Sequence, residues 1–183
     1  ELSVAIPGSD FTFTTLSYRQ KTYFAITDAL TLAVRGEVAV GDTYGDSNLY
    51  PFFEHFYAGG PGSVRGYEAY SLSSFRNDPT KSTLDSNGDA FGGQMLVTGS
   101  IELWFPTPLW DTSDSIRMFA FVDGGNVYKD YSSFSASELR YSAGLGFSWL
   151  SPFGLLNFSY AVPFKDQPGD DTEEFQFTFG TNF

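Results

Sequence analysis

The chain has 183 residues, which suits one domain, and its aromatic content of 19% is too high for a disordered chain. The net charge of −12 argues against binding to nucleic acid or to anionic lipid surfaces, and the lack of cysteine excludes a disulfide framework and a cysteine-based metal site. No stretch approaches the ~18 apolar residues of a transmembrane helix, which excludes a helical membrane protein but not one that crosses with alternating strands.

Alternation of apolar and small polar residues runs along most of the chain and predicts eight β-strands. A clear example is Y-S-A-G-L-G-F-S-W-L, residues 141–150. Because a strand turns successive side chains to opposite faces, one face of this segment is apolar and the other polar. The predicted strands are, in chain order, about 1–6, 11–24, 29–42, 92–106, 115–128, 139–150, 154–163 and 173–182.

The lengths of strands and connections favour a membrane barrel. Most strands reach the ~9–11 residues that a tilted membrane strand needs. Brief turns at 25–28, 107–114 and 151–153 alternate with longer or more polar connections at 43–91, 129–138 and 164–172, as in outer-membrane barrels. We therefore expect an all-β, transmembrane antiparallel β-barrel in the bacterial outer membrane. A soluble β-sandwich also alternates, but it rarely carries so many Phe and Tyr residues beside serine- and glycine-rich faces.

The same alternation predicts which side chains face lipid and which face the lumen. We expect the outward set to be Tyr141, Leu145, Phe147, Trp149, Phe175, Phe177 and Phe179, and the inward set to be Ser142, Ser148, Gln176 and Thr178. A slip of one residue in register would reverse every assignment.

The connection 43–91 is long enough to indicate a function of its own. Its second half, 74–91, is polar and is expected to be solvated and flexible. Its first half contains P-F-F-E-H-F-Y-A-G-G-P-G-S-V-R-G-Y, residues 51–67, and aromatic residues such as Phe52, Phe53, Phe56 and Tyr57 are expected to pack against the lumen wall.

Arg65, in this segment, is one of only ten basic residues. A buried guanidinium needs acceptors, preferably a bidentate carboxylate. Strand parity offers two, because Glu102 and Asp123 both point inward on neighbouring predicted strands. An exposed, unpaired Arg65 is equally consistent with the residues alone.

The segment F-Y-A-G-G-P-G-S-V-R-G-Y (56–67) resembles the F-Y-A-G-G…V-R-G-[FY] signature of the outer-membrane β-barrel assembly factors, the BamA family. Further matches are I-E-L-W-F-P-T-P (101–108), F-V-D-G-G-N-V-Y (121–128), S-P-F-G-L-L-N-F-S-Y-A-V-P-F (151–164) and F-Q-F-T-F-G-T-N-F (175–183). The resemblance covers the whole chain. It implies that the motif Val64, Arg65, Gly66 and Tyr67 folds back into the barrel and that Arg65 pairs with Glu102 and Asp123.

The resemblance also implies how much of a family barrel is present. Family members resemble a sixteen-stranded barrel preceded by periplasmic POTRA domains, whereas eight strands are predicted here and no POTRA segment. The chain opens at Glu1 without a signal peptide, like a mature or excised piece. We therefore expect residues 1–183 to form a single C-terminal half-barrel domain with the connection 43–91 inserted and POTRA domains absent.

The chain ends in an alternating strand that resembles the β-signal of outer-membrane proteins. An alternating strand with a free edge can add to another sheet, and its aromatic side chains supply specificity. The expected recognition or gate residues are Phe175, Phe177, Phe179, Gly180 and Phe183. The alternative is that these Phe residues simply face lipid. Gly180 permits a kink where the seam between first and last strands opens in the family.

Catalytic, metal and cofactor sites are not expected. His55, the only histidine, lies within the aromatic run and is expected to be a loop residue whose ring is satisfied. Asp85, Asn87 and Asp89 fail the spacing of a calcium loop, and turn chemistry explains them better.

The favoured function is non-enzymatic: insertion and folding of β-barrel proteins in the outer membrane by strand-edge templating. The alternative is a passive small barrel, or a translocator of the same superfamily (TamA-like or a secretion-partner pore). Expected partners are lipid bilayer or detergent, unfolded outer-membrane proteins and, for the full-length protein, accessory lipoproteins of the assembly complex. An eight-stranded barrel cannot also enclose the Arg65 loop, so two copies are expected to join edge to edge in a sixteen-stranded homodimer.

Overall fold

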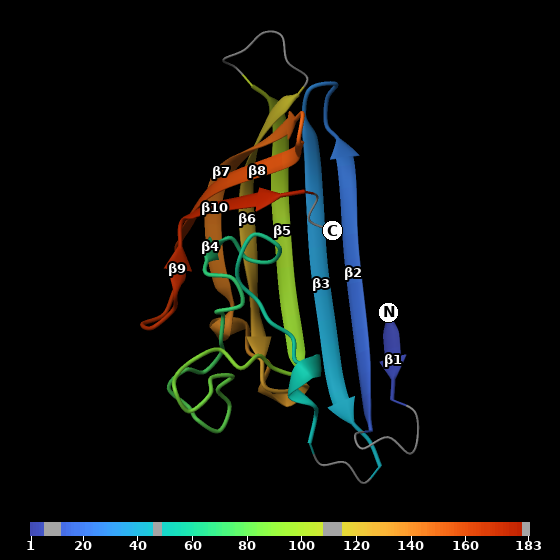
Figure 1. Cartoon of the computed structure of the whole chain (residues 1–183), viewed down its shortest axis with the longest axis vertical. Helices are drawn as coiled ribbons and strands as arrows, with labels where there is room; N and C mark the ends of the chain where they lie inside the picture. Colours follow the sequence, from blue (N-terminus) through green and yellow to red (C-terminus); the bar gives the residue numbers. More distant parts are fainter. Residues whose placement is uncertain (6–11, 46–48, 108–114, 181–183) are drawn as a thin grey trace.

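The computed structural model describes residues 1–5, 12–45, 49–107 and 115–180, and it shows one large antiparallel β-sheet (Figure 1). Eight strands follow the order β1-β2-β3-β5-β6-β7-β8-β10. Their bounds are β1 Leu2–Val4, β2 Phe13–Ala25, β3 Thr31–Thr43, β5 Met95–Pro106, β6 Ile116–Tyr128, β7 Arg140–Ser151, β8 Gly154–Pro163 and β10 Phe175–Phe179. The all-β, antiparallel prediction is confirmed.

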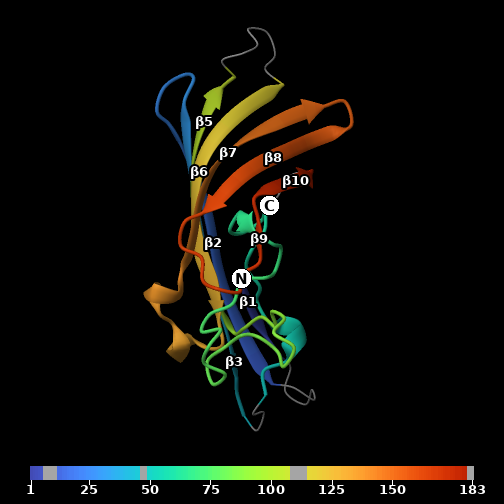
Figure 2. The ribbon, with the colours of Figure 1, turned by 90° about the vertical axis from the view of Figure 1, so that its left-hand side faces the viewer.

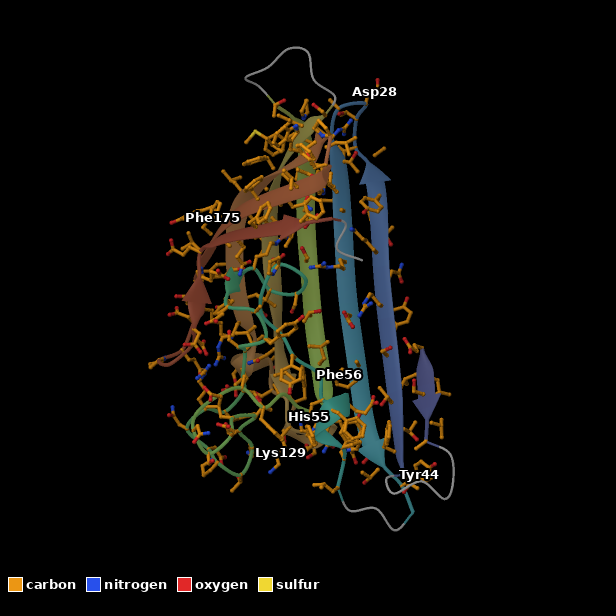
Figure 3. All side chains as sticks on the ribbon, viewed as in Figure 1. Asp28, Tyr44, His55, Phe56, Lys129 and Phe175 are labelled. Carbon is orange, nitrogen blue, oxygen red and sulfur yellow. The ribbon has the colours of Figure 1, made fainter. Side chains whose placement is uncertain are left out.

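The sheet is curved and twisted. Strands β7, β8 and β10 slant steeply across the direction of β2, β3 and β5 (Figure 1), and the turned view shows the same curvature (Figure 2). The long connection between β3 and β5 lies at the end opposite the turn that joins β2 to β3. Asp28 marks one end, and Tyr44 and Lys129 mark the other (Figure 3).

The predicted strand ranges agree closely with the observed ones, with two differences. The predicted strand 92–106 begins only at Met95, because the amide and carbonyl of Gly93 pair instead with Phe56. The predicted strand 173–182 divides into the short strand β9, Thr172–Glu173, and β10. β9 leaves the large sheet and pairs with a strand that periodicity does not predict, β4, Gly66–Tyr67.

The two faces of the sheet differ as the alternation predicts. Phe175, Phe177 and Phe179 are each more than half exposed, whereas Gln176 between them is 3% exposed. The labelled Phe175 projects from the edge of the fold (Figure 3). On β7, Leu145, Phe147 and Trp149 are exposed, Ser142 and Ser148 are buried, and Tyr141 is half-buried. Thr178 on β10 is half-buried as well. The exposed aromatic face is the one expected to meet lipid.

The inner face packs against the long connection. Val64, Tyr67 and Leu72 of the connection are buried against Leu96 and Val127 of the sheet. Three single turns of 3-10 helix complete the described elements: η1 Phe52–Glu54, η2 Tyr131–Ser133 and η3 Ala136–Glu138. In the part of the chain that the structure describes, no helix is long and apolar enough to cross a membrane.

Two expectations for the long connection are wrong. Phe52 and Phe53, both in the single helical turn η1, are 63% and 60% exposed instead of being packed against the lumen wall. Residues 74–91 are not wholly solvated: Ser74 and Thr83 are buried, and Thr83 donates a hydrogen bond to Ser73 Oγ at 2.7 Å. A short bridge between Leu84 and Ala90 also orders this stretch.

Candidate functional site

The candidate site forms where the long connection crosses the inner face of the sheet. Phe56 anchors the start of the crossing through its backbone bridge to Gly93. The chain then turns at Gly59, whose φ is +104° and where a Cβ atom would lie 2.4 Å from the carbonyl oxygen of Glu68. Only glycine suits that turn. The crossing brings Arg65 over β5 and β6.

Arg65 makes two ion pairs with the inner face. Its Nε lies 2.6 Å and its Nη2 2.8 Å from the two carboxylate oxygens of Asp123, a bidentate arrangement. Nη2 also lies 2.7 Å from Oε1 of Glu102 and 3.1 Å from Ser100 Oγ. The Arg65 backbone N–H donates to Asp123 as well, at 3.1 Å. Arg65 is 5% exposed and Asp123 fully buried, so these charges depend on one another.

Aromatic rings complete the surroundings of the guanidinium. The Cζ atom of Arg65 lies 3.5 Å from the ring centroid of Phe121 and 5.4 Å from that of Phe119. Trp104 Nε1 donates to Glu102 Oε2 at 3.0 Å and so fixes the second carboxylate. These rings were not predicted as site residues, although they share inward parity with Glu102 and Asp123. Parity alone could have found them.

The residues after Arg65 connect the motif to the end of the chain. Gly66 pairs with Glu173 and Tyr67 with Thr172, which forms the β4–β9 ladder. Gln176 Nε2 donates to the Tyr67 carbonyl at 2.7 Å. The Tyr67 hydroxyl donates to the carbonyls of Tyr141 and Lys165, and burial, followed by the charge of Asp170, raises the pKa of Tyr67. Tyr67 is therefore a neutral donor at physiological pH.

The C-terminal candidates lie at an edge of the sheet. β10 pairs with β8 on one side, and among the described residues no strand pairs with its other side. Gly180 directly follows β10 with a φ of +95°, and its carbonyl accepts from Asn157 Nδ2 at 3.2 Å. Phe183 lies outside the described residues.

The remaining candidates behave as ordinary loop residues. His55 Nδ1 lies 2.9 Å from the carbonyl oxygen of Phe91, and its ring stacks on Tyr50. Asp85 Oδ1 accepts from the backbone N–H groups of Asn87 and Asp89, which is turn chemistry. Within residues 1–5, 12–45, 49–107 and 115–180, no group of three or more His, Asp or Glu side chains could bind a metal ion.

The inner face also lines an open cavity of about 600 Å³. Four of its lining side chains are basic and one is acidic: Arg19, Lys21, Arg35, Arg65 and Glu102. β8 contributes Asn157 and Ser159 to the lining, and β10 contributes Gln176 and Thr178. The exposed aromatic face and this polar inner face together define the class of the protein, an outer-membrane β-barrel protein.

Comparison with known proteins identifies the family. The model of the Omp85 superfamily domain matches residues 1–183. The outer membrane protein assembly factor BamA of Neisseria meningitidis serogroup B is 36% identical over 98% of this chain and 25% of its own length. BamA of Nitratidesulfovibrio vulgaris is 32% identical over 81% of this chain and 17% of its own length. The chain belongs to the Omp85 superfamily.

More distant similarity agrees with this assignment. The sorting and assembly machinery component 50 homolog A of Xenopus laevis is 30% identical over 64% of this chain and 26% of its own length. The crystal structure of BamA from Haemophilus ducreyi lacking POTRA domains 1-3 superimposes with a TM-score of 0.80 at 28% identity, covering 95% of this chain and 36% of that one. This chain spans about a quarter or less of the curated relatives named here.

Proposed function

We propose that this chain supplies the part of an outer-membrane protein assembly factor that inserts and folds other β-barrel proteins. The observation that carries the proposal is the edge of β10, which has a partner strand on one side only among the described residues. Unpaired backbone groups in lipid cost several kcal/mol each, so such an edge favours the addition of another strand. The exposed Phe175, Phe177 and Phe179 would give the added strand its specificity.

In this proposal the Arg65 site has a supporting role. Its ion pairs fix the long connection to β5 and β6, and the β4–β9 ladder then connects it to the strand that precedes the edge. Strand addition forms hydrogen bonds and no covalent bond, so the activity is not enzymatic and needs no cofactor. In this proposal residues 1–183 act as a single C-terminal half-barrel domain with the connection 43–91 inserted.

The partners follow from the same mechanism. The substrates are unfolded outer-membrane proteins, and the exposed aromatic face contacts the bilayer. In the full-length protein, accessory lipoproteins of the assembly complex are the remaining partners. These assignments agree with the names of the BamA and component 50 relatives, which are assembly proteins.

β1 and β10 are the two edge strands of the described sheet, so each has a partner strand on one side only. We propose that two isolated copies join, with β1 or β2 of one copy beside β10 of the other, in a sixteen-stranded ring. The mass of the protein component in detergent, measured by light scattering, tests this. A dimeric mass supports it, and a folded species of strictly monomeric mass contradicts it.

Strand templating is tested by cross-linking to a substrate. The chain contains no cysteine, so Phe177→Cys places a single thiol of this chain on the edge strand. Phe147→Cys is the matched control, because it is an exposed aromatic position on β7, which has partner strands on both sides. Each variant is made in the intact protein and mixed with an unfolded barrel protein that carries one cysteine in its last strand.

The expected result is a disulfide between the substrate and Phe177→Cys, with little product from Phe147→Cys. Equal yields from the two positions would show that contact is non-specific and would contradict templating by β10.

A further inference from the structure

A second buried cluster of charged side chains lies away from the Arg65 site and has no role in the proposed function. Asp170 lies in the connection between β8 and β9, and its side chain is fully buried. Arg140 Nε lies 2.5 Å from Asp170 Oδ2, and Arg76 Nε lies 3.0 Å from Oδ1. We call Asp170, Arg76 and Arg140 the Asp170 cluster. One carboxylate therefore serves two arginines from segments distant in sequence.

The cluster joins two connections of the sheet and the start of β7. Arg76 belongs to the long connection, and Arg140 begins β7. Within the connection between β8 and β9, the Gln167 backbone N–H donates to Asp170 at 2.7 Å. Arg140 is fully buried and also donates to the carbonyls of Glu138 and Ser73, at 2.8 and 3.3 Å. Every hydrogen bond of the Asp170 carboxylate thus comes from a backbone turn or a buried guanidinium.

The cluster lies next in sequence to the segment that leads into the edge strand. Asp171 accepts a backbone hydrogen bond from Glu68 at 3.0 Å, and Thr172 and Glu173 form the β4–β9 ladder. β10 begins two residues after β9. If the connection that carries Asp170 were released, β9 would lose its pairing with β4. The start of β10 would then also lose the hydrogen bond from Gln176 to the Tyr67 carbonyl.

We propose that Asp170 is a positioning residue for the edge strand β10. By pairing with both Arg76 and Arg140, its carboxylate fixes the connection before β9, and the β4–β9 ladder then sets where β10 lies. The proposal rests on the proposed function only for the role of the β10 edge, since the positioning itself is a property of the fold.

The test is amide hydrogen exchange of the intact protein in detergent micelles. Asp170→Asn leaves two buried arginines without their shared carboxylate. The expected result is exchange in Thr172–Phe179 faster by about tenfold or more, with β5 and β6 unchanged. The matched control is Asp171→Asn, which removes the same charge one residue later; that side chain is 64% exposed, and its carboxylate reaches Arg76 Nη2 only at 3.9 Å. It is expected to change exchange by less than about twofold.

A rescue separates positioning from general loss of stability. Glu68→Cys and Asp171→Cys form a disulfide that fixes β4 to β9 without Asp170. In the Asp170→Asn background this disulfide is expected to restore slow exchange in β10. No restoration, or the same exchange in Asp170→Asn and Asp171→Asn, overturns the proposal.

If Asp170→Asn does not fold, Arg76→Gln is measured in its place, because it leaves the Arg140–Asp170 pair intact. Faster exchange confined to β9 and β10 then supports the proposal, and unchanged exchange overturns it. Substrate cross-linking is not part of these measurements, so failure of the templating proposal and failure of the Asp170 proposal give different results.

Discussion

The guanidinium of Arg65 lies over the ring of Phe121, with 3.5 Å between Cζ and the ring centroid, while the same guanidinium forms a bidentate pair with Asp123 two residues further along β6. One strand thus supplies both the carboxylate and the aromatic surface for a side chain of the long connection. The site therefore depends on the register of β6 as well as on the loop that carries Arg65.

Replacing Arg65 by Ala should destabilise the fold strongly. It leaves the fully buried Asp123 without its cation, and breaking a buried pair in this way costs about 3–5 kcal/mol. Urea unfolding in detergent measures the loss. The matched control is Arg19→Ala. The Arg19 side chain is 59% exposed, so its ion pair with Glu37 should contribute less than about 1 kcal/mol. Similar losses in both variants would contradict the importance assigned to the buried site.

The Phe121 ring needs the space that Gly144 leaves on β7. A Cβ atom at Gly144 would lie 2.6 Å from Cζ of Phe121 and 2.1 Å from the Tyr160 carbonyl oxygen. Gly144→Ala should therefore displace the ring and cost about 1–3 kcal/mol. Gly99→Ala is the control, since its nearest non-neighbouring atom lies 3.7 Å away. Equal melting temperatures for the two variants would show that the Phe121 ring can shift without cost, and would contradict this prediction.

Trp149 and Trp104 should report opposite faces of the sheet. Trp149 is 38% exposed on the apolar face, whereas Trp104 packs against Phe119 on the inner face. The test uses two variants of the protein. One keeps only Trp149 and the other keeps only Trp104, with Phe at the remaining tryptophan positions. Each variant is placed in bilayers of lipids with brominated chains. Because bromine quenches at contact, Trp149 fluorescence should fall much more than Trp104 fluorescence. Equal quenching would contradict the assignment of faces.

Gly180 should be required for its backbone conformation and not for space. Its φ is +95°, and nothing lies within 4 Å of a Cβ atom built there. Gly180→Ala should cost about 1–2 kcal/mol, the usual cost of a left-handed conformation for an L-residue. Gly62→Ala adds a methyl group to equally open space without a positive φ. A melting temperature lowered by Gly180→Ala and not by Gly62→Ala is the expected outcome; equal values would remove the conformational explanation.

The alternation of apolar and polar residues predicts most of the fold and part of the candidate site. Side chains alternate in every long strand, so both the strand positions and the inward direction of Glu102 and Asp123 could be read from residue types alone. The same reasoning extends to Phe119 and Phe121, which have the parity of Asp123.

The rest of the site could not be predicted in this way. β4 and β9 have two residues each, too short for any period, and their pairing depends on how the long connection folds. Asp170 and Arg140 are far apart in sequence and belong to no alternating pattern. Phe52 and Phe53 show the opposite failure, because their apolar character predicts burial, whereas both side chains of this single helical turn are exposed.

The β4–β9 ladder also sets an order of events during folding. The hydrogen bond from Gln176 to Tyr67 joins residues 109 positions apart, and the ladder beside it spans nearly the same stretch. Contacts this distant form only after a large entropic cost of loop closure, and therefore late. The hairpins β2–β3, β5–β6 and β7–β8 can form first, whereas the segment after Arg65 can pair only once Thr172 and Glu173 are in place. The β4–β9 ladder can therefore be complete only when the segment leading into β10 has reached its native position.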